Sequence, residues 1–305
     1  MAATPPMPAS AGRSFAKDLL AGGTAAGLSK TLVAPIERVK ILMQTQQADP
    51  LVRSNAVRPY AGIRDCFSRV YGEQGVASLW RGNGISVCRH APGRALGLAF
   101  KDLIRRGLPT DTTRGSAHLL AMNTFAGGAG AGLATCVVYP LDYAQTRLAS
   151  DVGKNRHFKG LWDCMVRTAK GPRGLRGLYA GMSLTIPATV LYRGCQVGSW
   201  DTITKSSMGD SLQSNLVAKI VLADMISIGS AYIVYPLDTV RRRLQVDGGD
   251  RPLSQRAYTG PLHCARTIWK QEGIIKGFYS GAGANAIRVL GGALLLVMYD
   301  EVRKC

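Results

Sequence analysis

Three related stretches decide the fold: Pro35-Ile36-Glu37-Arg38-Val39-Lys40, Pro140-Leu141-Asp142-Tyr143-Ala144-Gln145 and Pro236-Leu237-Asp238-Thr239-Val240-Arg241. Each has a proline at its first position, an acid at its third and Lys, Gln or Arg at its sixth. They recur roughly every hundred residues, and a repeat of fixed period indicates several copies of one structural unit. We therefore expect a single pseudo-threefold body, with repeats at 1–110, 111–208 and 209–305 of the 305 residues.

Each motif closes a long, mostly apolar segment, and a second long segment follows it. The first segments are 15–44, 117–148 and 215–246, and the second are 81–106, 181–206 and 279–304. All six are long enough to cross a bilayer. Gly23 with Gly27, and Gly128 with Gly132, have the small-residue spacing of helices packed in lipid, although a tightly packed soluble helix pair is the alternative. We expect an all-α membrane protein with six transmembrane helices, plus a short amphipathic helix in each repeat.

The composition narrows the class of function. A formal net charge of +19 fits nucleic-acid binding, a membrane surface or an anionic small substrate, but nucleic-acid binding does not explain six apolar segments. The seven cysteines form no CxxC pair and the histidines do not cluster, which argues against a disulfide framework and a zinc site. No catalytic triad or acid–base pair is recognisable. We expect no enzyme activity, no metal, no cofactor and no nucleic-acid partner.

Four cations interrupt the apolar segments: Lys30, Arg89, Arg94 and Arg288. Charged side chains are costly inside a membrane, so they should face a cavity or one another. Such a group, without matching acids, would suit a polyanionic substrate such as a phosphorylated compound. For any one of the four, the alternative is pairing with helix-end carbonyl groups or snorkelling to the membrane surface.

The acids and bases of the motifs can close a cavity. They are Glu37, Lys40, Asp142, Gln145, Asp238 and Arg241. An acid of one repeat and a base of the next could form a ring of ion pairs at one mouth. The opposite mouth has its own candidates, Asp102 with Arg105, Asp201 with Lys205 and Asp300 with Arg303. Two rings of breakable pairs around a central site describe alternating access.

Glycines recur between the two segments of each repeat, several of them in aromatic-x-Gly sequences such as Trp80-Arg81-Gly82. The set is Gly62, Gly75, Gly82, Gly160, Gly174, Gly181, Gly260, Gly273 and Gly281. Helices that open at such elements have free amide groups that could hold lipid phosphates. Ordinary turn glycines beside interfacial aromatic residues are the alternative. Cys66, Cys164 and Cys264 each lie four residues after a glycine of this set, Gly62, Gly160 and Gly260, and we interpret them as small packing residues.

At these motifs the chain resembles the mitochondrial carrier family, and within it the ADP/ATP carriers. Ala34-Pro35-Ile36-Glu37-Arg38-Val39-Lys40, Trp80-Arg81-Gly82-Asn83, Phe100-Lys101-Asp102, Tyr139-Pro140-Leu141-Asp142, Thr239-Val240-Arg241-Arg242-Arg243 and Tyr299-Asp300-Glu301 carry the resemblance. It implies a multi-pass protein of the mitochondrial inner membrane with three matrix-side helices and bound cardiolipin, exchanging ADP for ATP as a functional monomer. The motif ring would be the matrix gate and the opposite ring the cytoplasmic gate. Lys30, Arg89 and Arg288 would hold phosphates, and Tyr192 would border the adenine.

The substrate side departs from that pattern. The RRRMMM hallmark of ADP/ATP carriers becomes Arg241-Arg242-Arg243-Leu244-Gln245-Val246, and Ala188-Thr189 replaces the Gly-Ile pair expected at the adenine. Gln196 and Val197 stand in aromatic positions, and Val234 replaces a serine. A carrier of another phosphorylated or carboxylated anion is therefore an alternative, as is a proton or fatty-acid leak carrier.

The gates depart as well. Gln145 replaces the usual base, so Glu37 loses its ionic partner and the matrix ring should hold two ion pairs instead of three. Gln44 and Gln245 occupy positions where carriers commonly place a glutamine that braces this ring by hydrogen bonding. Thr204 takes the place of a base on the other mouth. Asp224, an acid deep in the fifth segment, is expected to face the cavity, with Arg94 as a partner or a substrate-tuning role as the alternative.

Overall fold

The computed structural model describes residues 9–107, 116–152, 157–204 and 216–288, and these residues contain helices and loops but no strand. Five helices are long: α1 (Ala9–Thr45), α4 (Asn83–Gly107), α5 (Ser116–Ala149), α7 (Met182–Thr204) and α9 (Leu216–Gly248). A further helical stretch spans 282–288. The expected first five segments each coincide with one long helix, whereas most of the sixth, 279–304, lies outside the described residues.

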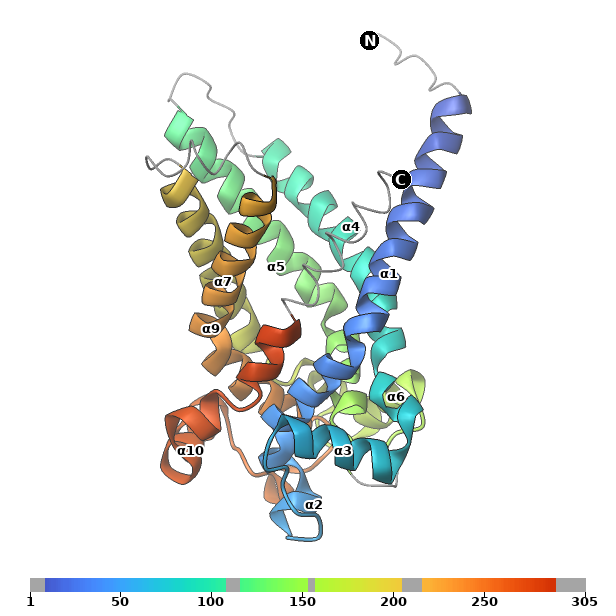
Figure 1. Ribbon diagram of the computed structural model, residues 1–305, viewed down its shortest axis with the longest axis vertical. Helices are drawn as coiled ribbons and strands as arrows, with labels where there is room; N and C mark the ends of the chain where they lie inside the picture. The colour runs from blue at the N-terminus through green and yellow to red at the C-terminus, as the bar shows by residue number, and fades with distance from the viewer. Residues whose placement is uncertain (1–8, 108–115, 153–156, 205–215, 289–305) are drawn as a thin grey trace.

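Short helices join the long ones. They are α2 (Pro50–Arg53), α3 (Ile63–Gln74), α6 (Leu161–Lys170) and α10 (Pro261–Gly273), with 3₁₀ turns η1 (Gln46–Ala48), η2 (Val76–Trp80), η4 (Gly174–Tyr179) and η5 (Leu253–Gln255), and a π turn η6 (Ile274–Phe278). In Figure 1 they gather at one end of the molecule, here called the short-helix end. The long helices lie closest together there and spread apart toward the other end.

The motif prolines lie inside the long helices. Pro35 is in α1, Pro140 in α5 and Pro236 in α9. A proline inside a helix removes one backbone hydrogen bond, so the three helices are interrupted at the same level of each repeat. Each helix continues past its proline into the short-helix end, which brings the motif side chains of the three repeats together.

Each repeat packs its own small core at the short-helix end. Cys66, Cys164 and Cys264 are fully buried, each in a separate apolar cluster. An aromatic residue six positions earlier in the chain, Tyr60 in the first cluster and Phe158 in the second, is buried beside its cysteine. The cysteines are therefore packing residues, as expected, and each short helix is bound to its own repeat.

The long helices carry large apolar side chains on their outer surfaces. Exposed examples are Leu28 and Leu32 on α1, Leu103 on α4, Phe125, Leu133 and Val137 on α5, Ile186 and Val190 on α7, and Val221, Met225 and Ile233 on α9. Such an apolar surface suits contact with lipid or another apolar partner. Among the described residues one stretch, Val221–Gly248, meets both the length and the hydropathy expected of a membrane span. The count of six transmembrane helices stays a prediction.

Candidate functional site

Two ion pairs join the motifs at the short-helix end. Lys40 Nζ lies 3.1 Å from Asp238 Oδ2, which joins α1 to α9. Arg241 pairs with Asp142, which joins α9 to α5. In each case a base contacts the acid of the preceding repeat, in cyclic order. The six motif residues Glu37, Lys40, Asp142, Gln145, Asp238 and Arg241 are called the ion-pair ring below.

The third contact of the ring is a neutral hydrogen bond. Gln145 Nε2 donates to Glu37 Oε1 at 3.2 Å, between α5 and α1. Among the described residues no cation lies within ion-pair distance of Glu37. The ring therefore contains two ion pairs and one weaker link, which the sequence predicted from Gln145.

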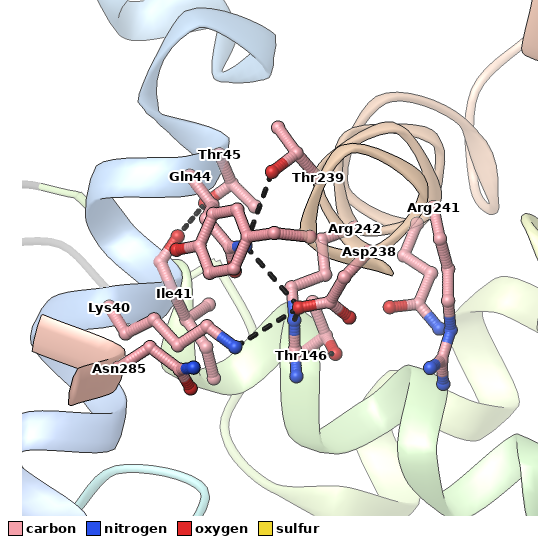
Figure 2. A network of polar contacts seen from close by, with 12 residues as sticks. Lys40, Ile41, Gln44, Thr45, Thr146, Asp238, Thr239, Arg241, Arg242 and Asn285 are labelled. Carbon is pink, nitrogen blue, oxygen red and sulfur yellow. Dashed lines mark hydrogen bonds and ion pairs between the residues drawn. The ribbon is translucent and has the colours of Figure 1, made fainter. Parts of the chain in front are cut away.

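Two glutamines brace the ion pairs. Gln44 Nε2 donates to Asp238 Oδ2 and to the Thr239 hydroxyl, both at 3.3 Å, as Figure 2 shows. Gln245 Nε2 donates to Asp142 Oδ2 at 3.2 Å. Both glutamines are fully buried, so each holds a carboxylate in place where water does not compete.

Arg242 also contacts the ring, although the sequence did not single it out. Its Nε lies 3.3 Å from Asp238 Oδ2, and its NH1 donates to the Thr146 hydroxyl at 3.2 Å (Figure 2). Asp238 thus faces two cations and an amide. The run Arg241-Arg242-Arg243 was the available signal, but a run of arginines does not show which of them points into the ring.

Tyrosines support the two ion pairs. Lys40 Nζ lies 5.0 Å from the ring centroid of Tyr235, and the Arg241 guanidinium lies 5.4 Å from that of Tyr139. Each tyrosine hydroxyl donates to a backbone oxygen, of Ser280 and Ala180 respectively. The residues before the second and third motif prolines therefore fix the position of the cations.

Three glycines allow the second segment of each repeat to approach the ring. Gly82, Gly181 and Gly281 have φ values of 84°, 80° and 77°, which favour glycine. A Cβ there would lie 3.1 Å from the Gln145 carbonyl oxygen, 2.8 Å from that of Arg241 and 3.0 Å from that of Lys40, respectively. These three glycines of the predicted lipid set therefore have a packing role.

A cavity of about 580 Å³ lies against one side of the ring. Its basic lining residues are Arg89, His90, Arg94, Lys101, Arg193 and Arg241, and its acid is Asp142. Arg89 NH1 lies 3.3 Å from Asp142 Oδ1, so this arginine belongs to the cavity and to the ring. Within the described part of the chain, Arg94 and Lys101 form no ion pair. The excess of cations makes the cavity suitable for a polyanion.

Lys30 belongs to the same electrostatic group. Its charge interacts with those of Glu37, Arg288, Arg89 and Arg94. Arg288, from the stretch 282–288, donates to Asn285 Oδ1 at 3.2 and 3.3 Å. The four predicted cations therefore lie in one region. His90, Lys101 and Arg193 also line the cavity but were not predicted to, because their orientation depends on how α4 and α7 pack.

Of the residues predicted to border an adenine, Ala188, Thr189 and Tyr192, only Thr189 lines the cavity. Thr189 lines the cavity and donates its hydroxyl to the Thr185 carbonyl at 2.7 Å. Ala188 is buried, and Tyr192 is half-buried and does not line the cavity. The structure thus brings Thr189 to the cations, while a contact by Tyr192 stays a prediction.

The opposite mouth shows no closed ring in the described residues. Asp102 and Arg105 are exposed on α4 and form no ion pair there. The side chain of Asp201 and all of Lys205, Asp300 and Arg303 lie outside the described residues. Their role in a second gate stays a prediction.

The remaining glycines divide into two groups. Gly62, Gly160 and Gly260 precede α3, α6 and α10 with extended backbones and open space around the Cβ position. Gly75, Gly174 and Gly273 have positive φ and open the turns that follow the short helices. A second cavity of about 430 Å³ is lined by Gly181 and Gly260 together. Lipid binding at these elements stays a prediction.

The expected pairing of Asp224 with Arg94 is wrong. Among the described residues no cation lies within ion-pair distance of the Asp224 carboxylate, and it does not line the cavity. The two residues lie on α9 and α4, and α9 packs mainly against α7 while α4 packs against α5. The expectation from helical periodicity that Asp224 faces the cavity is therefore not met either.

Comparisons with known proteins agree with the repeats. The family model "Mitochondrial carrier protein" matches residues 12–112, 117–211 and 213–305. The chain is 45% identical over 298 residues to the "ADP,ATP carrier protein" of Parachlorella kessleri, covering 95% of this chain and 85% of the relative. It is 43% identical over 298 residues to "ADP/ATP translocase 3" of Homo sapiens, covering 95% of this chain and 97% of the relative.

Proposed function

Because the chain belongs to the mitochondrial carrier family, we propose that it exchanges ADP for ATP across the mitochondrial inner membrane by alternating access. One observation carries this proposal: a cavity with a large excess of cations lies directly against a ring closed by two ion pairs and one hydrogen bond. Relatives named as ADP/ATP carriers match almost the whole chain. The structure corresponds in this proposal to a state with the matrix gate closed.

The cations bind the phosphates in the proposed site. Arg89 and Arg94 line the cavity, and Lys30 and Arg288 add charge beside them. Guanidinium groups match phosphate oxygens in pairs. Thr189 and Tyr192, on α7, border the base. Because the described residues leave Arg94 without an ion pair, the phosphates do not have to break an existing salt bridge there.

Arg89 couples binding to the gate. It lies 3.3 Å from Asp142 and also lines the cavity. A phosphate that attracts Arg89 removes one of the cations from Asp142, which leaves that carboxylate to Arg241 and Gln245. Substrate binding thereby lowers the free energy needed to open the ring. The substrate attracts Arg89 away from Asp142, so it binds more tightly to the state in which the ring is opening than to the closed state.

The exposed apolar side chains of the long helices support the proposal that the protein is inserted in the membrane. Six transmembrane helices, including the segment 279–304, would place the exposed apolar side chains of the long helices against lipid. The short helices α3, α6 and α10 then lie on the matrix side. Cardiolipin phosphates would bind at Gly62, Gly160 and Gly260, which precede helices without a side-chain cap and so leave first-turn amides for an anion. We propose a functional monomer, because the cavity and ring are complete within one chain.

Transport by reconstituted protein tests this function. Liposomes loaded with ADP should take up labelled ATP, and Arg89→Ala should abolish the uptake. Arg64→Ala is the matched control, because Arg64 is exposed on α3 and forms no ion pair among the described residues. Absence of uptake of either nucleotide by the wild-type protein would refute the proposal.

A carrier of another phosphorylated or carboxylated anion is the second candidate. Thr189 favours it, since a hydroxyl-bearing residue lines the cavity where the ADP/ATP pattern has an apolar one. A panel of anions in a thermal-shift assay separates the two, because a true substrate stabilises the folded protein by mass action. Stabilisation by a different anion, with none by ADP or ATP, would favour this candidate.

A further inference from the structure

Three buried arginines lie next to the ion-pair ring without belonging to it. They are Arg38 on α1, Arg147 on α5 and Arg243 on α9, with exposed fractions of 1%, 4% and 0%. Burying a guanidinium is costly unless its donors are satisfied. Their partners therefore indicate what these residues do.

Each arginine donates to the last turn of a long helix in the next repeat. Arg38 Nε lies 3.3 Å from the Ala149 oxygen at the end of α5. Arg147 donates to the Val246 oxygen near the end of α9. Arg243 Nε lies 3.0 Å from the Gln44 oxygen near the end of α1. The three contacts run in a closed cycle.

These contacts have a clear physical basis. The last carbonyl groups of a helix have no partner within the helix, and the C-terminal end attracts cations. Each arginine satisfies such a carbonyl in a different repeat from its own. The ends of α1, α5 and α9 are thereby held together, and the contacts must break if these ends separate.

The sequence explains why the first repeat differs. Arg147 and Arg243 stand at equivalent positions after Pro140 and Pro236, and Leu42 stands at that position after Pro35. Arg38 lies four residues before Leu42, one turn earlier on the same face of the helix. The cycle is therefore completed from a different position in the first repeat.

We propose that Arg38, Arg147 and Arg243 form a second lock on the mouth that the ion-pair ring closes, and that the seam between α1 and α5 is its weakest part. The proposal rests on the alternating access described above. It adds positioning residues for the closed state, because none of the three arginines contacts the cavity.

The weakness of that seam comes from the counter-charges. Arg243 pairs with Glu272, with NH2 at 2.7 Å from Oε2, and Arg147 NH2 lies 2.9 Å from both oxygens of Asp250. Arg38 has only neutral acceptors instead: Gln74 Oε1, at 2.7 Å from NH2, and the backbone oxygens of Ser78 and Asp151.

The same seam lacks an ion pair in the ring, where Gln145 faces Glu37. Both layers are thus weakest between α1 and α5. Helix ends with fewer charged contacts separate at lower cost, so α1 and α5 should part first when this mouth opens.

The substitution Gln74→Glu tests the second lock by strengthening it. Gln74 precedes Gly75 as Glu272 precedes Gly273, so a carboxylate there should pair with Arg38. The expected result is a rise in Tm of about 2–4 °C, together with a fall in exchange turnover of about five-fold. Glu73→Gln is the control, because the one ion pair of Glu73 among the described residues is with Arg69 of its own helix.

The substitution Arg38→Gln should act in the opposite direction. Without nucleotide, it should lower Tm and speed hydrogen–deuterium exchange in 141–152, while Glu73→Gln leaves both unchanged. A Gln74→Glu protein whose Tm does not rise, or an Arg38→Gln protein that matches the control, would overturn the proposal. The Tm and hydrogen–deuterium exchange measurements need no nucleotide. They therefore test the second lock separately from nucleotide exchange.

Discussion

Single residues decide how firmly the ring closes. Lys40 and Arg241 each bind a carboxylate of the preceding repeat, whereas Gln145 reaches Glu37 only through a hydrogen bond of 3.2 Å. The difference was readable from the sequence, because the three motif copies can be compared position by position. The roles of Arg242 and His90 were not, since they depend on side-chain directions fixed by packing between helices.

Gln145→Lys should complete the ring. A cation at this position would lie beside Glu37 and form a third ion pair, which should raise Tm by about 2–4 °C and slow exchange, because opening would break one more contact. Gln145→Ala is the matched control and should lower Tm slightly. Faster exchange by Gln145→Lys with an unchanged Tm would contradict the description of the ring.

Arg94→Ala should weaken substrate binding without opening the ring. Arg94 lines the cavity and forms no ion pair among the described residues, so its loss removes a phosphate contact worth about 1.4 kcal/mol, or roughly ten-fold in KM. The substrate-free Tm should stay at the wild-type value. Concentration dependence of ATP uptake measures KM, and an unchanged KM would exclude Arg94 from the site.

Asp250 should give the stability a specific pH dependence. Burial alone would raise the pKa of this carboxyl, but the hydrogen bond from His157 and the charges of Arg147 and Arg251 hold it well below its usual range. A carboxyl whose pKa is lower in the folded than in the unfolded protein stabilises the fold at pH values above its unfolded pKa of about 4. This stabilisation is lost as the pH falls below that value. His157 and Arg147 contact it at 3.1 and 2.9 Å.

The variant Asp250→Asn measures that contribution. At pH 7 it should be less stable than wild type by about 2 kcal/mol, and the difference in Tm should shrink as the pH is lowered below about 4. Thermal unfolding of both proteins between pH 7.5 and 3.5 provides the comparison. A difference that grows at low pH would show that the ionised carboxylate does not stabilise the fold.

At the scale of elements, periodicity and length predicted most of the structure. The long segments 15–44, 117–148 and 215–246 correspond to α1, α5 and α9, and the short amphipathic helices correspond to α3, α6 and α10. The prolines did not end the long helices, because packing at the short-helix end stabilises the turns that follow. Which helix faces which could not be predicted, and the expected Asp224–Arg94 contact failed for that reason.

The short helices should protect their cysteines from reaction. Burial raises the pKa of Cys66, Cys164 and Cys264 to about 12, so at pH 7.5 almost none is thiolate, the reactive form. In the folded protein these three should resist a maleimide, and unfolding should expose all seven cysteines. Mass spectrometry of labelled peptides locates the modified residues. Rapid labelling of Cys164 in folded, substrate-free protein would contradict the packing of α6.

At the scale of the whole molecule, the threefold repeat predicted one body built around a central axis. The net charge of +19 left nucleic acid, membrane surface and anionic substrate open, and the position of cations in a cavity favours the last. The sequence could not show which mouth is closed. That depends on which set of breakable contacts forms, and the ion-pair ring and the arginine contacts both close the short-helix end.

The central claim is that this cavity and ring exchange nucleotides, one for one. The most direct measurement is the initial rate of labelled ATP uptake into liposomes that contain the purified protein and are either loaded with ADP or empty. Exchange by alternating access predicts rapid uptake into the loaded liposomes and almost none into the empty ones. Equal uptake into both, or no uptake into either, would contradict it.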